Sequence, residues 1–180
     1  MPNESKGNNS IVFVTVGTTL FEALIQAMTD ETVLDKLVQL GFSTLVLQYG
    51  KGDVPKLPSK YRSSSMPLQV EMYDFKDTLA ADMQRADLII GHAGAGTVSE
   101  VLSYPNTKKL VVVINNALMH NHQTELACAM RDRHHLCVID EPSLLLQTTA
   151  WDTIARFNPV PLPPGDPHDF PRLLNTFLDA

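Results

Sequence analysis

The feature that most constrains this 180-residue sequence is a regular alternation of short apolar runs with segments of helical spacing. Residues 11–16 and 110–114 are almost wholly apolar and rich in β-branched side chains. Because successive strand side chains point to opposite faces, such runs predict strands buried on both faces, as in a parallel sheet. The alternation therefore predicts an α/β fold with a doubly wound, mainly parallel, Rossmann-like sheet.

The remaining elements follow from the same patterns, with Asp30 as an expected helix cap and Gly41 as a helix end. Residues 49–65 contain Gly, Pro and Ser and are expected to form a long loop. The expected strands are 11–16, 44–48, 68–72, 87–90, 110–114 and 136–138, and the expected helices are 20–28, 33–40, 77–85, 97–102, 120–130 and one from 143 onward.

The length allows one well-buried domain, which we place at residues 11–157. Residues 1–10 are polar and are expected to be a flexible N-terminus. Residues 158–180 form a Pro-rich arm and a short amphipathic helix, because 158–171 hold six of the twelve prolines and apolar residues resume after them. This tail either packs back on its own domain or docks on a partner subunit.

Composition excludes several classes of function. The net charge of −6 argues against nucleic-acid binding, which draws on clustered Lys and Arg. The two cysteines, Cys128 and Cys137, lack the spacing of a metal site. No apolar leader or run of about 18 apolar residues is present, so we expect a cytoplasmic protein with reduced thiols.

Two loops that follow expected strands carry glycines. Gly17 comes after the first strand and is followed by the hydroxyls of Thr18 and Thr19, which suit a phosphate, although many tight turns share this composition. Three glycines lie at 91, 94 and 96, ahead of a helix whose N-terminus favours a diphosphate. Glu100 lies one turn further, where its carboxylate could accept hydrogen bonds from ribose hydroxyls; an ordinary glycine-rich turn with an incidental Glu is the alternative.

Three common motifs are not met in this second loop. The spacing is GxxGxG and not the GxGxxG of dinucleotide-binding sites, and no GK[ST] follows as in a P-loop. Ala93 stands where a hydrolase nucleophile elbow needs Ser. The sequence therefore favours a phosphate-bearing ligand but argues against a dinucleotide site, a P-loop and a hydrolase nucleophile.

A third loop, residues 115–125, is polar and follows the strongest expected strand. His120 and His122 form an HxH pattern, but a metal site needs a further ligand. Amide and imidazole groups suit the hydroxyl and acetamido groups of a sugar, so we expect no metal here.

The phrase HAGAGTVSE at 92–100, with NHQ and ELA within 121–127, resembles glycosyltransferase family 28. VFVTVGTT at 12–19 and LVVVIN at 110–115 make the chain similar to cytosolic subunits of dolichol-linked UDP-GlcNAc transferases. The resemblance spans about residues 11–140, and PPGDPHDF in the tail fits it too.

This resemblance implies a GT-B architecture, in which two Rossmann-like halves face each other across a cleft. One chain of this length supplies only the donor-binding, C-terminal half. The resemblance therefore implies a separate membrane-anchored subunit that brings the lipid-linked GlcNAc acceptor and recruits the complex to the cytosolic face of the endoplasmic reticulum. It implies no cofactor besides the UDP-GlcNAc donor, and the sequence has no DxD motif.

Carried over position by position, Glu100 matches the ribose-binding carboxylate and Phe75 with the Lys76 backbone matches the segment against the uracil. Bacterial peptidoglycan-precursor enzymes carry Gln-Gln where this chain has His122 and Gln123. The general base is expected to be His92 or a carboxylate of the partner. The full set expected to bind the donor is Gly17, Thr18, Thr19, Phe75, Lys76, Ala95, Gly96, Thr97, Glu100, Asn121, His122 and Gln123.

The reaction implied is transfer of GlcNAc from UDP-GlcNAc to GlcNAc-diphosphate-dolichol with inversion, giving a β1,4 link. A non-catalytic UDP-sugar-binding regulatory paralogue is the alternative. A sugar-nucleotide epimerase fragment would need a second Rossmann half, which the length excludes.

Overall fold

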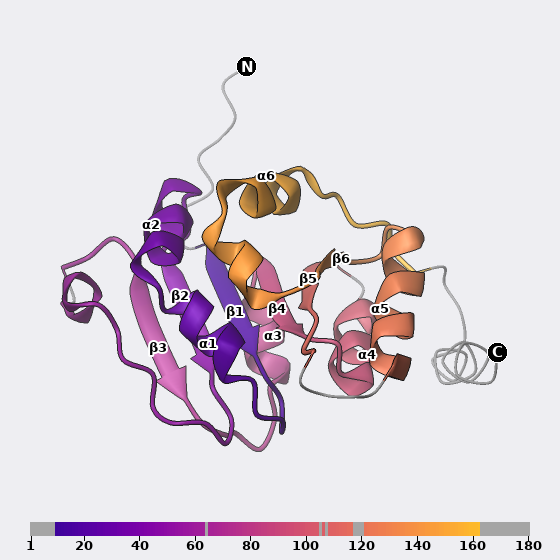
Figure 1. Ribbon diagram of the computed structural model, residues 1–180, viewed down its shortest axis with the longest axis horizontal. Coiled ribbons are helices and arrows are strands. Elements are labelled where there is room, and N and C mark those ends of the chain that lie inside the picture. Colours follow the sequence, from indigo (N-terminus) through magenta and orange to yellow (C-terminus); the bar gives the residue numbers. More distant parts are fainter. Residues whose placement is uncertain (1–9, 64, 105, 107, 117–120, 163–180) are drawn as a thin grey trace.

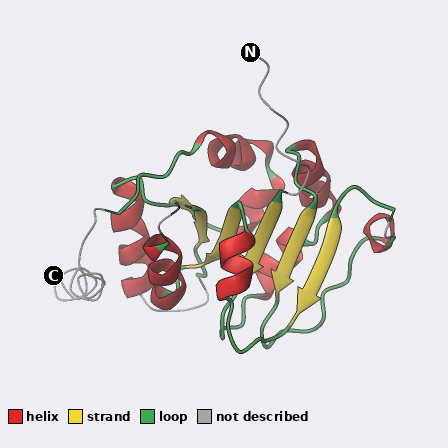
Figure 2. Cartoon of the chain, turned by 180° about the vertical axis from the view of Figure 1, so that it is seen from behind, coloured by secondary structure: helices red, strands yellow, loops and turns green. Residues whose placement is uncertain are grey.

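A computed structural model of the chain describes residues 10–63, 65–104, 106, 108–116 and 121–162, with no side-chain description for 121–123. It consists of one sheet with helices on both faces (Figures 1 and 2). The strands are β1 (Ile11–Thr15), β2 (Thr44–Gln48), β3 (Gln69–Tyr73), β4 (Leu88–His92), β5 (Lys109–Val113) and β6 (Cys137–Ile139). The helices are α1 (Glu22–Met28), α2 (Glu31–Gln39), η1 (Ser59–Arg62), α3 (Ala80–Arg85), α4 (Ala95–Ser103), α5 (Asn121–Asp132), η2 (Pro142–Leu146) and α6 (Thr148–Arg156).

Every strand pair in the sheet is parallel, and the strand order is β3-β2-β1-β4-β5-β6. The chain moves outward from β1 to β3 and then returns to place β4 on the other side of β1. Ligands of open α/β sheets bind outside the carboxyl ends of the strands at such a reversal. The predicted doubly wound parallel fold is confirmed, and the reversal lies between β1 and β4.

The core has two parts, one on each face of the sheet. On one face, Leu45 and Leu47 of β2 pack with the residues of α1, α2, η2 and α6. On the other face, Val46 of the same strand packs with residues of α3, α4 and α5. Successive side chains of β2 thus point into different cores, which explains why the strand is apolar at consecutive positions.

Local signals account for several element boundaries. The Asp30 carboxylate accepts a hydrogen bond from Thr32 N at 2.8 Å and caps α2, as expected. Gly41 ends the segment after α2 with a φ of +86°, which glycine adopts without steric cost. No helix among the described residues is long and apolar enough to cross a membrane.

The structure corrects two expectations. The helix expected from residue 143 onward is two elements, η2 and α6, because Gln147 between them is extended with ψ of 136°. The loop expected over 49–65 contains the 3₁₀ turn η1, which is anchored where Tyr61 donates a hydrogen bond to Asp35. The latter contact buries Tyr61 against α2.

The first part of the Pro-rich arm packs on its own domain. Val160 N donates to His134 O at 2.8 Å, and Val160 O accepts from the His135 ring at 2.8 Å. Leu162 packs against the core beneath α4 and α5. The expected tail helix within 163–180 and the expected flexible residues 1–9 lie outside the described residues.

Candidate functional site

The first two glycine-bearing loops lie side by side at the carboxyl edge of the sheet. The turn at Gly17 follows β1, and Gly94 follows β4, its immediate neighbour. An added Cβ on Gly17 would lie 3.0 Å from Cε1 of His92, so the two loops are in contact. The structure thus brings together two of the three expected parts of the site at the reversal in strand order.

The turn after β1 is closed by its own threonine. Gly17 has a φ of +59°, and Thr19 donates to Val16 O through both its amide (3.2 Å) and its hydroxyl (2.8 Å). The Thr19 hydroxyl proton is therefore engaged in the turn, whereas Thr18 is exposed. Of the two expected hydroxyls, Thr18 is the one available as a donor to a phosphate.

His92, the last residue of β4, lies with its ring between two glycines. Its exposure is 6%, and an added Cβ on Gly94 would lie only 2.3 Å from Nε2. The Nδ1 atom is buried and pairs with no group in the described part of the chain. Burial lowers the pKa of the His92 imidazole, an effect that the backbone of Thr15 opposes only in part. The ring is therefore neutral at neutral pH.

The N-terminus of α4 presents open amide groups. Gly94 is its N-cap and makes no side-chain capping bond, and Val98 N is the amide that bonds back to Gly94 O, at 3.0 Å. The amides of Ala95, Gly96 and Thr97 precede that bond and have no carbonyl partner within the helix. An added Cβ on Gly96 would meet nothing within 4 Å. This arrangement suits an anion at the helix start.

Glu100 is exposed and lies on the same helix. Its Oε1 accepts a hydrogen bond from the Tyr104 hydroxyl at 3.3 Å, and its backbone carbonyl accepts from Ser103 at 2.7 Å. The carboxylate keeps further acceptor capacity, since each of its two oxygens has two lone pairs.

The segment after β3 carries an exposed aromatic ring. Phe75 is 46% exposed, whereas the Lys76 ammonium is held 2.7 Å from the carboxylate of Asp82 and 3.8 Å from the centre of the Tyr73 ring. β3 is two strands away from β1, but α3, which follows this segment, packs against β1. The Lys76 side chain is thus committed to Asp82, and its backbone is the part left for a ligand.

The third loop meets the first where the structure describes it. Asn115 Nδ2 donates to Leu20 O at 3.4 Å. Residues 117–120, with His120, lie outside the described residues, and Asn121, His122 and Gln123 are described only as the first turn of α5. Their expected contacts with a sugar stay predictions. Within the described residues, no group of three or more His, Cys, Asp or Glu could hold a metal ion.

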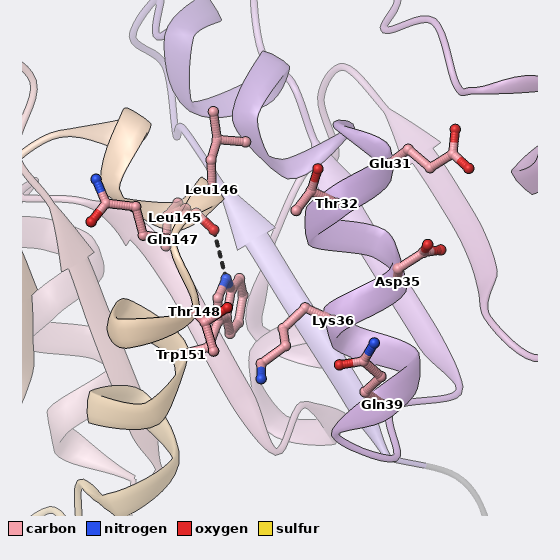
Figure 3. A pocket seen from close by; sticks show the side chains of 10 residues that line it. All are labelled: Glu31, Thr32, Asp35, Lys36, Gln39, Leu145, Leu146, Gln147, Thr148 and Trp151. Carbon is pink, nitrogen blue, oxygen red and sulfur yellow. Dashed lines mark hydrogen bonds between the residues drawn. The ribbon is translucent and has the colours of Figure 1, made fainter.

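Two surface cavities lie elsewhere. One of about 420 Å³ lies between α2 and the η2–α6 segment, next to Trp151, whose indole N–H donates to Leu145 O at 2.6 Å (Figure 3). The other, of about 560 Å³, lies between α1 and the loop that follows β2. Neither is lined by an expected site residue.

Sequence reasoning missed Gln48, the last residue of β2. It is 1% exposed and hydrogen-bonds to residues of the first loop and of the segment after β3. The sequence does contain a signal for this role: Gln48 is a polar residue at the end of an apolar strand, and a polar side chain buried there needs hydrogen-bond partners.

Residues 11–149 match the model of the glycosyltransferase family 28 C-terminal domain. The chain belongs to glycosyltransferase family 28. The family 28 match covers the whole sheet and both glycine-bearing loops.

Relatives in this family carry a specific description. A human protein described as UDP-N-acetylglucosamine transferase subunit ALG13 is 47% identical over 125 residues, which are 69% of this chain and 10% of the human one. A Yarrowia lipolytica protein of the same description is 39% identical over 129 residues, 71% of this chain and 64% of that one. The matched segment therefore spans about a tenth of the human relative.

Solved structures share the fold. An NMR structure of ALG13 superposes with a TM-score of 0.66 at 22% identity, covering 93% of this chain and 96% of that one. The crystal structure of Acinetobacter baumannii MurG gives 0.65 at 20% identity, with 98% of this chain on 52% of MurG. The family 28 chain thus has the fold of about half of MurG.

Proposed function

We propose that this chain is the catalytic, donor-binding subunit of a heteromeric transferase that moves GlcNAc from UDP-GlcNAc to GlcNAc-diphosphate-dolichol. The observation that carries the proposal is the open N-terminus of α4 beside His92, at the strand-order reversal. Family membership and the description of the human and Yarrowia relatives as transferase subunits support it. The match to about half of MurG is consistent with a missing second half, and we propose that a membrane-anchored partner at the cytosolic face of the endoplasmic reticulum supplies it.

In the proposed site, the diphosphate lies at the start of α4 against the amides of Ala95, Gly96 and Thr97, with the Gly17 turn on its other side. Glu100 accepts hydrogen bonds from the ribose hydroxyls, and the exposed Phe75 ring packs on the uracil. Asn121, His122 and Gln123 are assigned to the sugar. The proposal includes no metal.

In the proposed reaction, the acceptor hydroxyl attacks the anomeric carbon from the face opposite UDP, which inverts the configuration and gives a β1,4 link. Negative charge grows on the diphosphate as the bond to the sugar breaks. Amides fixed at a helix N-terminus stabilise this charge without having to reorganise. The role of these groups is therefore electrostatic.

A general base takes the proton of the acceptor hydroxyl. His92 has the protonation state for this role, because burial lowers the pKa of its imidazole and leaves it neutral. Its ring lies between Gly17 and Gly94, so substrate binding must open a path to it. A carboxylate of the partner is the other candidate.

The test measures GlcNAc transfer from UDP-GlcNAc to a synthetic lipid-diphosphate-GlcNAc acceptor. The isolated chain should bind UDP and show almost no transfer, and membranes that contain the partner subunit should restore it. Glu100→Ala should remove transfer in the restored system while the chain still folds and still joins the partner. Full transfer by the isolated chain would contradict the half-enzyme proposal, and unchanged transfer by Glu100→Ala would favour the non-catalytic regulatory paralogue.

A further inference from the structure

Gln48 lies in the last register row of β1, β2 and β3 before their loops begin. It pairs in register with Thr15 of β1 on one side and with Tyr73 of β3 on the other, and Thr15 in turn pairs with Gly91 of β4. The row thus links β3, β2, β1 and β4 directly below the expected site and continues into β5 and β6. At 1% exposure, Gln48 is a fully buried polar side chain in this row.

The amide of Gln48 uses its hydrogen-bonding capacity on the end of β1, the turn that follows it and the segment after β3. Oε1 accepts from Thr15 Oγ1 at 2.6 Å, from Val16 N at 3.1 Å and from Gly17 N at 2.9 Å. Nε2 donates to Gly17 O at 2.9 Å and to Asp74 O at 2.8 Å. Donors surround one end of the amide and carbonyls the other, so only one orientation of the group satisfies the network.

These partners belong to two separate parts of the expected site. Gly17 begins the turn proposed to face the diphosphate, and the Asp74 carbonyl belongs to the peptide unit that carries the Phe75 amide. That amide donates to the Asp74 carboxylate at 2.6 Å, so the same peptide unit is held at both ends. Gln48 is therefore a single side chain that ties the phosphate turn to the segment that presents Phe75.

We propose that Gln48 is a positioning residue that sets the spacing between the phosphate side and the uracil side of the donor site. The inference rests on the proposed function for the identity of the ligand, but the hydrogen bonds themselves do not depend on it. A buried amide that is fully satisfied fixes its neighbours, because any displacement leaves a buried polar group unpaired.

Two substitutions distinguish the contribution of the Gln48 Nε2 group from that of the whole amide. Gln48→Glu keeps an oxygen for Thr15, Val16 and Gly17 but replaces the NH₂ group that serves two carbonyls. Gln48→Met keeps the approximate length and removes every polar contact. Leu45→Ala is the matched control. Leu45 belongs to the same strand and is fully buried, but its side chain packs in the core with residues of α1, α2, η2 and α6 and not against the loops.

The experiment measures UDP binding by calorimetry, amide hydrogen exchange at Gly17 and Phe75, and the thermal midpoint, all on the full chain. We expect Gln48→Glu to weaken UDP binding at least tenfold. The second carboxylate oxygen would face the carbonyl oxygens of Gly17 and Asp74 and repel them, so both segments should loosen and hydrogen exchange at the amides of Gly17 and Phe75 should become at least tenfold faster. Leu45→Ala should lower the thermal midpoint yet keep UDP affinity within twofold. If Gln48→Met does not fold, Gln48→Glu decides alone.

UDP affinity within twofold of the unmodified chain in Gln48→Glu would overturn the proposal, as would an equal loss of affinity in Leu45→Ala. If the unmodified chain binds no UDP, the proposed function fails. Exchange at Gly17 and Phe75 then decides the coupling by itself: faster exchange supports it, and unchanged exchange overturns it.

Discussion

A Cβ atom added to Gly94 would lie 2.3 Å from Nε2 of His92, well inside the distance at which two such atoms can pack. The φ of Gly94 is −71°, which any residue adopts, so packing and not backbone conformation requires glycine at this position. The His92 ring fills the space where a side chain would be, directly beside the start of α4.

We expect Gly94→Ala to displace the His92 ring and to destabilise the chain by about 1–3 kcal/mol, as overpacking of a well-packed site does. UDP binding should fall with it, because the ring lies between Gly94 and Gly17 and the added methyl group pushes it toward the Gly17 turn. Urea unfolding and calorimetry with UDP measure the two effects.

Gly96→Ala is the comparison for stability. An added Cβ there meets nothing within 4 Å, and alanine favours a helix over glycine by up to about 1 kcal/mol. The variant should be as stable as the unmodified chain or slightly more stable. A loss of stability equal to that of Gly94→Ala would show that the His92 contact is not the cause.

The buried His92 should make the chain less stable in mild acid. Its pKa is lowered on folding, so the unfolded chain binds the proton first as the pH falls below the ordinary histidine value of about 6.5. The contribution to stability is complete above that pH and is lost as the pH falls toward the folded pKa, at no more than about 1.4 kcal/mol per pH unit.

Urea unfolding at several pH values between 7.5 and 5.0 measures this loss. His92→Gln cannot titrate, so its unfolding free energy should fall less steeply than that of the unmodified chain. Parallel curves for the two proteins would mean that His92 is protonated in the folded chain as readily as in the unfolded one.

The sequence predicted those features that depend on patterns along the chain. Strand residues such as Val46, flanked by Leu45 and Leu47, are apolar at every position because each face of the sheet has its own core. The parallel fold follows from that, and the glycine spacing around His92 locates the loop at the start of α4.

The sequence did not predict features that depend on contacts between distant segments. Gln48 is one polar residue at the end of an apolar run, and its partners lie 26 to 33 positions away in sequence. The ion pair between Lys76 and Asp82 is local, six positions apart, but it has no sequence pattern either, since Asp82 occupies an ordinary place in a helix. Only the fold shows that these side chains support the loops.

Recognition of the ribose should depend on Glu100. Its exposed carboxylate is proposed to accept hydrogen bonds from the ribose hydroxyls, so the chain should bind UDP about tenfold more tightly than 2′-deoxy-UDP. Glu100→Gln should weaken UDP binding and reduce this preference while leaving the thermal midpoint unchanged. Calorimetry with both nucleotides tests it, and an undiminished preference in Glu100→Gln would place the ribose elsewhere.

Asp82 should be more important for stability than its exposed neighbour Glu71. Asp82 is 4% exposed, and its carboxylate accepts hydrogen bonds from Tyr73 at 2.5 Å, from Lys76 at 2.7 Å and from Arg85 at 3.1 Å. Burial alone would raise the pKa of Asp82, but the hydrogen bonds from Lys76 and Tyr73 outweigh it and lower the pKa. The carboxylate is therefore charged in the folded chain, and its stabilising contribution is lost only as the pH falls below about 3.8.

Asp82→Asn should cost about 1–3 kcal/mol at pH 7, less than for a fully buried ion pair because Lys76 and Arg85 are partly exposed. Arg85 also binds the carboxylate of Glu71, whose side chain is 52% exposed. Glu71→Gln removes that carboxylate and should lower the unfolding free energy by less than about 1 kcal/mol. Because Lys76 follows Phe75 directly, Asp82→Asn should also weaken UDP binding, whereas Glu71→Gln should not. Urea unfolding and calorimetry on the two variants decide this, and equal costs for both would assign the stabilisation to Arg85 and not to the buried carboxylate.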